Sequence, residues 1–129
     1  MKILRTIIEN IYIQGQKELP AEACGYLAGQ DQQITKYYPM TNVDRSEEHF
    51  TLDPQEQFKV IKEIRQAGLQ LLAVYHTHPA SPARPSAEDI KLAFDPNIIY
   101  VIASLLGEAN IKAFKIQKGK VINLELEVI

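Results

Sequence analysis

The sequence is poor in cysteine and tryptophan, and it contains neither a long hydrophobic run nor a marked excess of one charge. Cys24 is the only cysteine among 129 residues. This excludes an intramolecular disulfide framework and any zinc finger built from cysteines. Without a disulfide to form, the chain fits a reducing compartment, and we expect it in the cytoplasm. The N-terminus is not a signal peptide, because Glu9 interrupts its apolar run, and no run reaches the roughly 18 residues of a membrane span.

The charges nearly cancel: 14 basic and 16 acidic side chains give a net charge of −2. No basic face is implied, so we do not expect nucleic acid as a partner. Without a membrane-spanning run, we expect no membrane partner either. Apolar residues make up 46% and charged residues 23% of the chain, which is ordinary for a globular protein and excludes disorder and coiled coils. The length predicts one domain over residues 1–129.

Hydrophobic periodicity predicts helices alternating with strands. One helix starts with Asp53 as its N-cap and Pro54 as its first residue, has Phe58 on its apolar face, and stops at Gly68. Ser86 opens a short helix that ends before Asp95. The other predicted elements are a first helix over 3–17, weakened at its end by Gly15, a short strand over 48–52, and strands over 21–29, 32–38, 69–75, 98–105, 110–117 and 120–128. This order is typical of an α/β or α+β fold with a mixed central sheet flanked by helices.

Two histidines at the end of a predicted buried strand are the first candidates for chemistry. His76 and His78 are two residues apart, so their side chains lie on one face of the strand and could share a metal ion. Alternatively, they merely occupy a hydrated rim.

Ser86 and Asp89 allow two interpretations. Ser followed three residues later by an acid resembles a capping box at the start of the short helix. The same cap would hold the Asp89 carboxylate where it could face a metal on the preceding strand. Two histidines and one aspartate form a zinc set with an open position, which is the composition of a catalytic zinc site.

Glu22 is the candidate proton acceptor for a metal-bound water. It lies among small and apolar residues of a predicted strand, where a carboxylate is costly unless it is paired or functional. An exposed rim position is the alternative.

Together these residues resemble a known family. The pattern of Glu22, His76-Thr77-His78, seven residues, Ser86, two residues and Asp89 is similar to the JAMM motif of MPN-domain metalloproteases. The flanking residues are similar as well: Pro20, Gly25, Pro79 and Pro85. The resemblance covers essentially the whole chain and implies one MPN-like domain.

The resemblance also implies a role for each residue. His76, His78 and Asp89 would bind one Zn²⁺ per chain, Glu22 would act as general base and then general acid, and Ser86 would donate to the developing oxyanion. An insertion that follows the motif aspartate in deubiquitinating members is missing here. The chain therefore resembles the compact stand-alone prokaryotic members, some of which act on ubiquitin-like sulfur carriers.

We therefore predict a zinc-dependent peptidase or isopeptidase that cleaves at the Gly-Gly tail of a small ubiquitin-like or sulfur-carrier protein. The tail would add to residues 48–52 as an edge strand, with the Pro-rich loop 79–85 forming the other wall. Two alternatives are a non-catalytic MPN scaffold and a zinc nucleobase deaminase, although the Pro-Cys-x-x-Cys motif of deaminases is missing.

Four further residues carry weaker signals. We interpret Cys24 as a small core residue, His49 as a surface residue and Arg84 as a solvated loop residue that could meet a substrate. Asn42 is a polar loop residue to which the sequence assigns no role.

Overall fold

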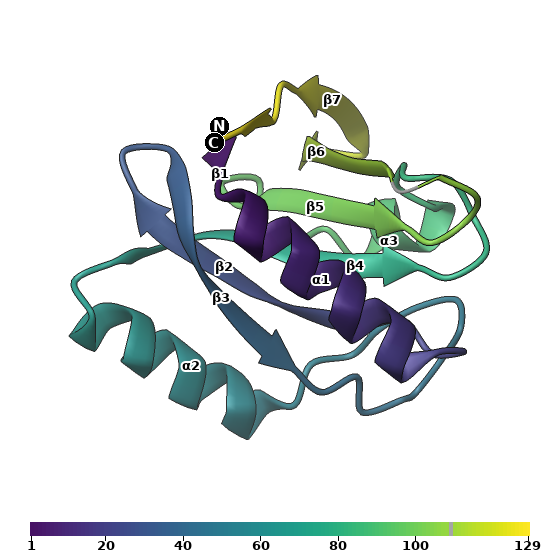
Figure 1. Cartoon of the computed structure of the whole chain (residues 1–129), viewed down its shortest axis with the longest axis horizontal. Helices are drawn as coiled ribbons and strands as arrows, with labels where there is room; N and C mark the ends of the chain where they lie inside the picture. Colours follow the sequence, from purple (N-terminus) through teal and green to yellow (C-terminus); the bar gives the residue numbers. More distant parts are fainter. Residues whose placement is uncertain (109) are drawn as a thin grey trace.

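One mixed sheet of eight strands forms the centre of the fold, in the computed structural model that describes residues 1–108 and 110–129 (Figure 1). The strand order is β7-β6-β5-β4-β2-β3-β1-β8. The pairs β4–β5, β1–β3 and β1–β8 are parallel, and the other pairs are antiparallel. The strands are β1 (Lys2–Ile3), β2 (Cys24–Gln30), β3 (Gln33–Met40), β4 (Gln70–His78), β5 (Ile99–Ser104), β6 (Asn110–Gln117), β7 (Lys120–Leu124) and β8 (Glu127–Val128).

Helices cover both faces of the sheet, which confirms the predicted α+β architecture. The helices are α1 (Arg5–Glu18), α2 (Pro54–Gln66) and α3 (Ala87–Lys91). Side chains alternate along a strand, so neighbouring residues serve different cores. Leu27 of β2 and Tyr75 of β4 pack with α1, whereas Tyr26 and Val74 pack with α2. The central strands β2 and β4 are therefore buried on both faces.

Helix α1 differs from its prediction at both ends. It begins at Arg5, because residues 2–3 instead form β1 beside β3. It also continues through Gly15 to Glu18. The glycine is explained by a close approach to the sheet, since a Cβ atom at residue 15 would lie 3.0 Å from Thr77 Cγ2. Gly15 thus lets α1 pack directly against the segment that carries the two histidines.

Helix α2 has the predicted boundaries but not the predicted buried face. Asp53 caps it by accepting a hydrogen bond from the Gln55 amide, and Gly68 follows its end with φ +73°. The prediction that Phe58 belongs to the apolar face is wrong, because this side chain is 75% exposed. The helix buries Val60 and Ile64 instead.

Two strand predictions need correction. Residues 48–52 form no strand, and only an isolated bridge joins Leu52 to Asn42. Hydrogen bonds from the Asn42 side chain and one main-chain bond, from the Val43 amide to the Thr51 carbonyl, hold this segment in place of a ladder. The predicted strand over 120–128 is interrupted: β7 pairs with β6, while β8 pairs with β1 at the opposite edge of the sheet.

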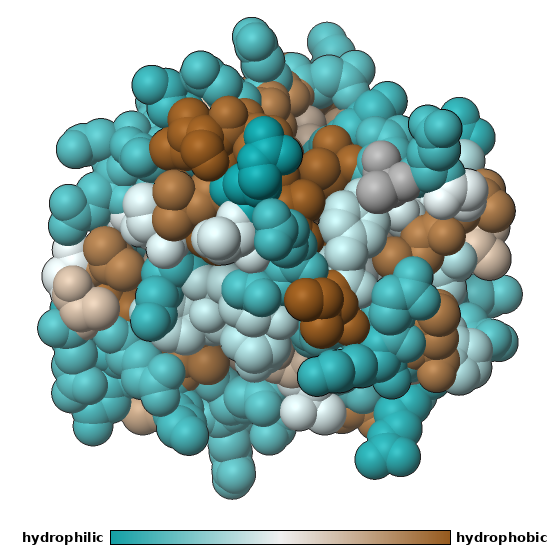
Figure 2. Space-filling model, viewed as in Figure 1, coloured by the Kyte–Doolittle hydropathy of each residue, from teal (hydrophilic) through white to brown (hydrophobic). Residues whose placement is uncertain are grey.

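The surface over α1 carries mostly hydrophilic side chains, with separate apolar patches between them (Figure 2). Among the described residues, no helix has the length and apolar character needed to cross a membrane. The functional candidates gather around the carboxyl end of β4.

Candidate metal centre

The two histidines lie at the carboxyl end of β4, beside the parallel strand β5. His76 pairs with Ile102 and His78 with Ser104 in the ladder. The carboxyl ends of parallel strands are a common place for ligand sites in α/β sheets. The alternation predicted from the sequence brings the two rings together, with 3.1 Å between their Nε2 atoms. Both side chains are buried, so the alternative of a hydrated rim is wrong.

Asp89 joins the histidines and also caps α3. Its Oδ2 atom lies 3.1 Å from Nε2 of His76 and 3.1 Å from Nε2 of His78. The same oxygen accepts a hydrogen bond of 2.9 Å from the Ser86 amide, and Ser86 Oγ accepts one from the Asp89 amide. The capping box of the sequence therefore exists, and it aims the carboxylate at the two imidazoles.

This cluster requires a positive charge. His78 Nδ1 lies 2.8 Å from the Pro82 carbonyl oxygen, to which it can only donate. A neutral His78 would then turn the lone pair of Nε2 toward the Asp89 carboxylate. Burial lowers the pKa of His78, but its hydrogen bonds to Asp89 and Pro82 outweigh this and raise it overall. A proton or a metal cation between Nε2 of His76, Nε2 of His78 and Oδ2 of Asp89 would relieve the repulsion between the Nε2 lone pair and the carboxylate.

Glu22 reaches the same place from the segment that leads into β2. The prediction that it lies within the strand is wrong, since β2 starts at Cys24. Two hydrogen bonds join Ala23 to Thr77: the Ala23 amide donates to Thr77 Oγ1 at 2.8 Å, and the Thr77 amide donates to the Ala23 carbonyl at 2.9 Å. The Glu22 amide donates to the Ser46 carbonyl. The residue between the two histidines thus fixes the main chain that carries Glu22.

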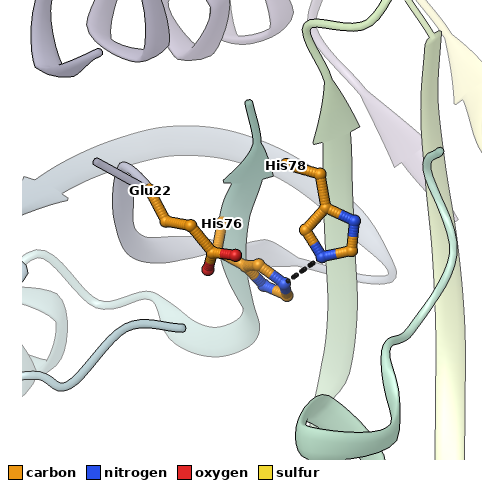
Figure 3. Close-up of side chains that lie close together, drawn as sticks. All are labelled: Glu22, His76 and His78. Carbon is orange, nitrogen blue, oxygen red and sulfur yellow. Dashed lines mark hydrogen bonds between the residues drawn. The ribbon is translucent and has the colours of Figure 1, made fainter. Parts of the chain in front are cut away.

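The carboxyl group of Glu22 is buried and points toward the two imidazoles (Figure 3). One oxygen or nitrogen from each of Glu22, His76 and His78 lies within 4.8 Å of the others. Oε1 of Glu22 has no hydrogen-bond partner among the described residues. Burial raises its pKa to about 8; the charge of His78 opposes this rise, and those of Asp89 and Glu88 add to it. A carboxyl group with such a pKa can exchange a proton near neutral pH.

Asn42 is the functional candidate that sequence reasoning missed. The side chain is buried, and its Nδ2 donates to the carbonyls of Glu22 at 3.1 Å and His49 at 3.0 Å. Its Oδ1 accepts from the amides of Asp44 and Thr51. An asparagine followed by a polar loop signals such local hydrogen bonding, but not which distant carbonyl it reaches. The Asn42 side chain therefore connects the main chain of Glu22 to that of Asp44, His49 and Thr51.

We expect Asn42→Ala to lower the free energy of unfolding by about 2–4 kcal/mol, because it removes one buried and several part-buried hydrogen bonds worth about 1 kcal/mol each. Chemical denaturation measures this change. Asn97→Ala serves as a control, since Asn97 is exposed and its substitution should cost less than about 0.5 kcal/mol. Equal losses in the two variants would contradict the role given to Asn42.

The remaining residues singled out in the sequence have clear places. Cys24 is fully buried, as predicted, and burial raises its thiol pKa to about 12. Arg84 is exposed. His49 is only half-buried, and its Nε2 lies 3.0 Å from Asp44 Oδ2, so it belongs to the hydrogen-bonded loop rather than to the open surface.

Two hollows border the cluster. The first, which we call the apolar cleft, has a volume of about 350 Å³ and is lined by His76, Asp89, Phe50, Leu52, Leu92 and Phe94, among others. The ring of Phe50 stacks on His76 with 4.8 Å between centroids. The second, which we call the acidic cavity, has a volume of about 550 Å³ and is lined by Glu22, His78, Ser86, Glu47, Glu48 and Glu88, among others.

The site consists of two buried histidines at the end of β4 and the carboxyl groups of Asp89 and Glu22 beside them. This arrangement defines a metal-binding α+β protein. The family described as prokaryotic homologs of the JAB domain matches residues 4–117, and the chain belongs to this family. The family and fold predicted from the sequence are thereby confirmed.

Three similar proteins match about two thirds or more of the chain. The CysO-cysteine peptidase of Mycobacterium tuberculosis is 32% identical over 98% of this chain and 90% of its own length. A Thermus thermophilus protein named "Probable TtuB-protein conjugate cleaving protease" is 34% identical over 93% of this chain and 78% of its own. A desampylase of Haloferax volcanii is 38% identical over 66% of this chain and 63% of its own.

Solved structures agree on the fold. A Desulfitobacterium hafniense protein solved in solution superimposes with a TM-score of 0.92 at 40% identity, covering 100% of this chain and 93% of that one. A JAB1/MPN domain protein from Archaeoglobus fulgidus has a TM-score of 0.68 at 23% identity, covering 100% of this chain and 99% of that one. The second similarity concerns the fold alone.

Proposed function

We propose that this protein is a zinc-dependent hydrolase that cleaves the peptide or isopeptide bond following the tail of a small ubiquitin-like or sulfur-carrier protein. The observation that carries the proposal is the convergence of His76, His78 and Asp89 next to the buried carboxyl group of Glu22, which has no partner at Oε1 among the described residues. The names of the relatives supply the substrate class, since they refer to CysO-cysteine and to TtuB conjugates.

The donor set fits zinc. Nε2 of His76, Nε2 of His78 and Oδ2 of Asp89 lie 3.1 Å from one another. In a tetrahedral zinc site with Zn–ligand bonds of 2.0–2.1 Å, two ligand atoms lie about 3.3 Å apart, which is close to this spacing. His78 donates through Nδ1 to a carbonyl, an arrangement typical of a histidine that binds metal through Nε2. Asp89 is a better third ligand than Glu22, because Glu22 lies within a looser limit of 4.8 Å. A bound zinc ion would lower the pKa of a water to about 7 and polarise the scissile carbonyl.

The residues around the metal would divide the proton transfers and charge stabilisation. Glu22 would take a proton from the attacking water and deliver it to the leaving nitrogen. Ser86 lines the same cavity, and its Oγ accepts from the Asp89 amide, so its O–H remains free to donate to the developing oxyanion. Thr77 and Asn42 would keep Glu22 in place through its main chain.

The substrate tail would lie in the apolar cleft. The predicted addition of the tail to an edge strand at 48–52 loses its basis, because that segment is not a strand. Phe50 and Leu52 of this segment instead line the cleft, together with Leu92 and Phe94. A Gly-Gly sequence would pass along these side chains toward the metal without a side-chain clash.

Two alternatives are weaker. A non-catalytic scaffold has no use for the costly burial of Glu22 beside two histidines. A nucleobase deaminase does not agree with the family to which the chain belongs. The cytoplasmic location and the extent of the domain over residues 1–129 stay predictions.

The test is to incubate the protein with a ubiquitin-like carrier that is extended beyond Gly-Gly. We expect mass spectrometry to show release of everything after the second glycine, abolished by a strong chelator and restored by zinc. Replacing the penultimate glycine with phenylalanine should block cleavage, because a bulky side chain at this position would clash with the side chains that line the cleft beside His76 and Asp89. Equal cleavage of both carriers, or full activity with chelator present, would contradict the proposal.

A further inference from the structure

The acidic cavity carries an inference about which leaving groups the site accepts. It rests on the proposed function, because it concerns the same scissile bond. The general acid must reach the nitrogen of the leaving group. Glu22 lines the acidic cavity and a further hollow beside Pro20 and Arg45, but not the apolar cleft. Of the two hollows that Glu22 lines, only the acidic cavity also includes a candidate metal ligand, His78, among the described residues. The leaving group therefore occupies the acidic cavity, while the acyl part, the carrier tail, occupies the cleft.

The charge of this cavity is one-sided. Glu47 and Glu48 come from the loop after β3, and Glu88 comes from the first turn of α3. No lysine or arginine is among the described residues that line it. These three side chains are exposed, so their field is screened by salt but persists at low ionic strength.

A buried group points to a ligand in the same cavity. Glu22 is 2% exposed, and its Oε1 lacks a hydrogen-bond partner among the described residues. A leaving amine would supply the missing partner. A carboxylate next to that amine, as in a single amino acid released from a chain end, would enter the negative field of the three exposed glutamates that line the same cavity.

We propose that the acidic cavity selects against leaving groups that bear a carboxylate beside the scissile bond and favours uncharged or cationic ones. The lysine of a protein joined to the carrier through an isopeptide bond belongs to the favoured class. The cavity thus biases the site toward conjugates over carriers extended by one free amino acid.

Three substrates that differ only in charge test this. A ubiquitin-like carrier is prepared by ligation so that Gly-Gly is followed by alanine with a free carboxylate, by alaninamide, or by lysinamide. At low salt we expect kcat/KM for the amide to exceed that for the acid by about three- to tenfold, with lysinamide equal to or above alaninamide. At 0.5 M salt the ratio should approach one.

Variants locate the effect. Glu47→Gln combined with Glu48→Gln should reduce the amide-to-acid ratio at least about twofold, and Glu47→Lys with Glu48→Lys should bring it to one or below. Glu63→Gln with Glu125→Gln is the matched control, since both residues are exposed glutamates outside the cavity, and it should keep the wild-type ratio. A wild-type ratio of one, or a ratio unchanged in the lysine variant, overturns the inference and leaves the proposed function standing. Cleavage of none of the three carriers overturns the proposed function itself.

Discussion

Glu22→Gln is expected to lower kcat by at least about 100-fold while the protein keeps its zinc. The substitution preserves shape and removes the ability to accept a proton, and general acid–base catalysis is worth about 10²–10⁴ in rate. Zinc retention follows because Glu22 is not among the three atoms held 3.1 Å apart. Steady-state kinetics on an extended carrier, together with metal analysis of the same sample, measures both. Undiminished activity would refute the role of Glu22 as general base.

The stability of the metal-free protein provides a control that does not depend on turnover. Burial raises the pKa of Glu22 from its ordinary value of 4.5 to about 8, so the folded state holds this proton more tightly than the unfolded state does. The resulting stabilisation is complete below about pH 4.5 and is lost as the pH rises to about 8. Glu22→Gln is neutral at every pH and should therefore be more stable than wild type above pH 8, by a few kcal/mol. Identical pH profiles of unfolding would show that the carboxyl group is not held in a desolvated place.

Local signals in the sequence predict most of the fold. The Asp53 cap, Pro54 and Gly68 delimit α2 because each acts within its own turn of the chain. Residues 48–52 were beyond such reasoning. Their alternation suits a strand, but the His49 carbonyl and the Thr51 amide bond to the side chain of Asn42, which lies outside the segment and competes with strand pairing. Phe58 is similar, because its spacing suits a buried face and only the position of α2 on the sheet leaves it exposed.

Most of the candidate site was also predictable, because local signals in the sequence bring its residues together. The period of two along β4 brings His76 and His78 to one face, and the period of the capping box brings Asp89 to the start of α3. Glu22 was identified from its position among small and apolar residues and from the resemblance to the JAMM motif. The contribution of Asn42 and the separation of an apolar cleft from an acidic cavity depend on loops that fold back over β4, and no periodicity encodes them.

Asp89→Ala is expected to lower zinc affinity by more than about 100-fold and to abolish activity. Partners in the outer shell of a metal site alone are worth 10–100-fold in affinity, and this carboxylate lies 3.1 Å from both imidazole nitrogens. Competition against a chromophoric chelator measures the affinity. The variant also loses half of the capping box, so it should be less stable by about 1 kcal/mol even without metal.

Ser86→Ala separates the loss of zinc binding from the loss of helix capping. It removes the other half of the capping box and should cost a similar 1 kcal/mol or so, but it leaves the Asp89 carboxylate in place. We therefore expect Ser86→Ala to keep full zinc occupancy and Asp89→Ala to lose it, although the two variants are destabilised alike. If Asp89→Ala were less stable yet bound zinc as tightly as wild type, Asp89 would be a helix cap only. The third ligand would then have to come from Glu22, which among the described residues groups with the two histidines within 4.8 Å.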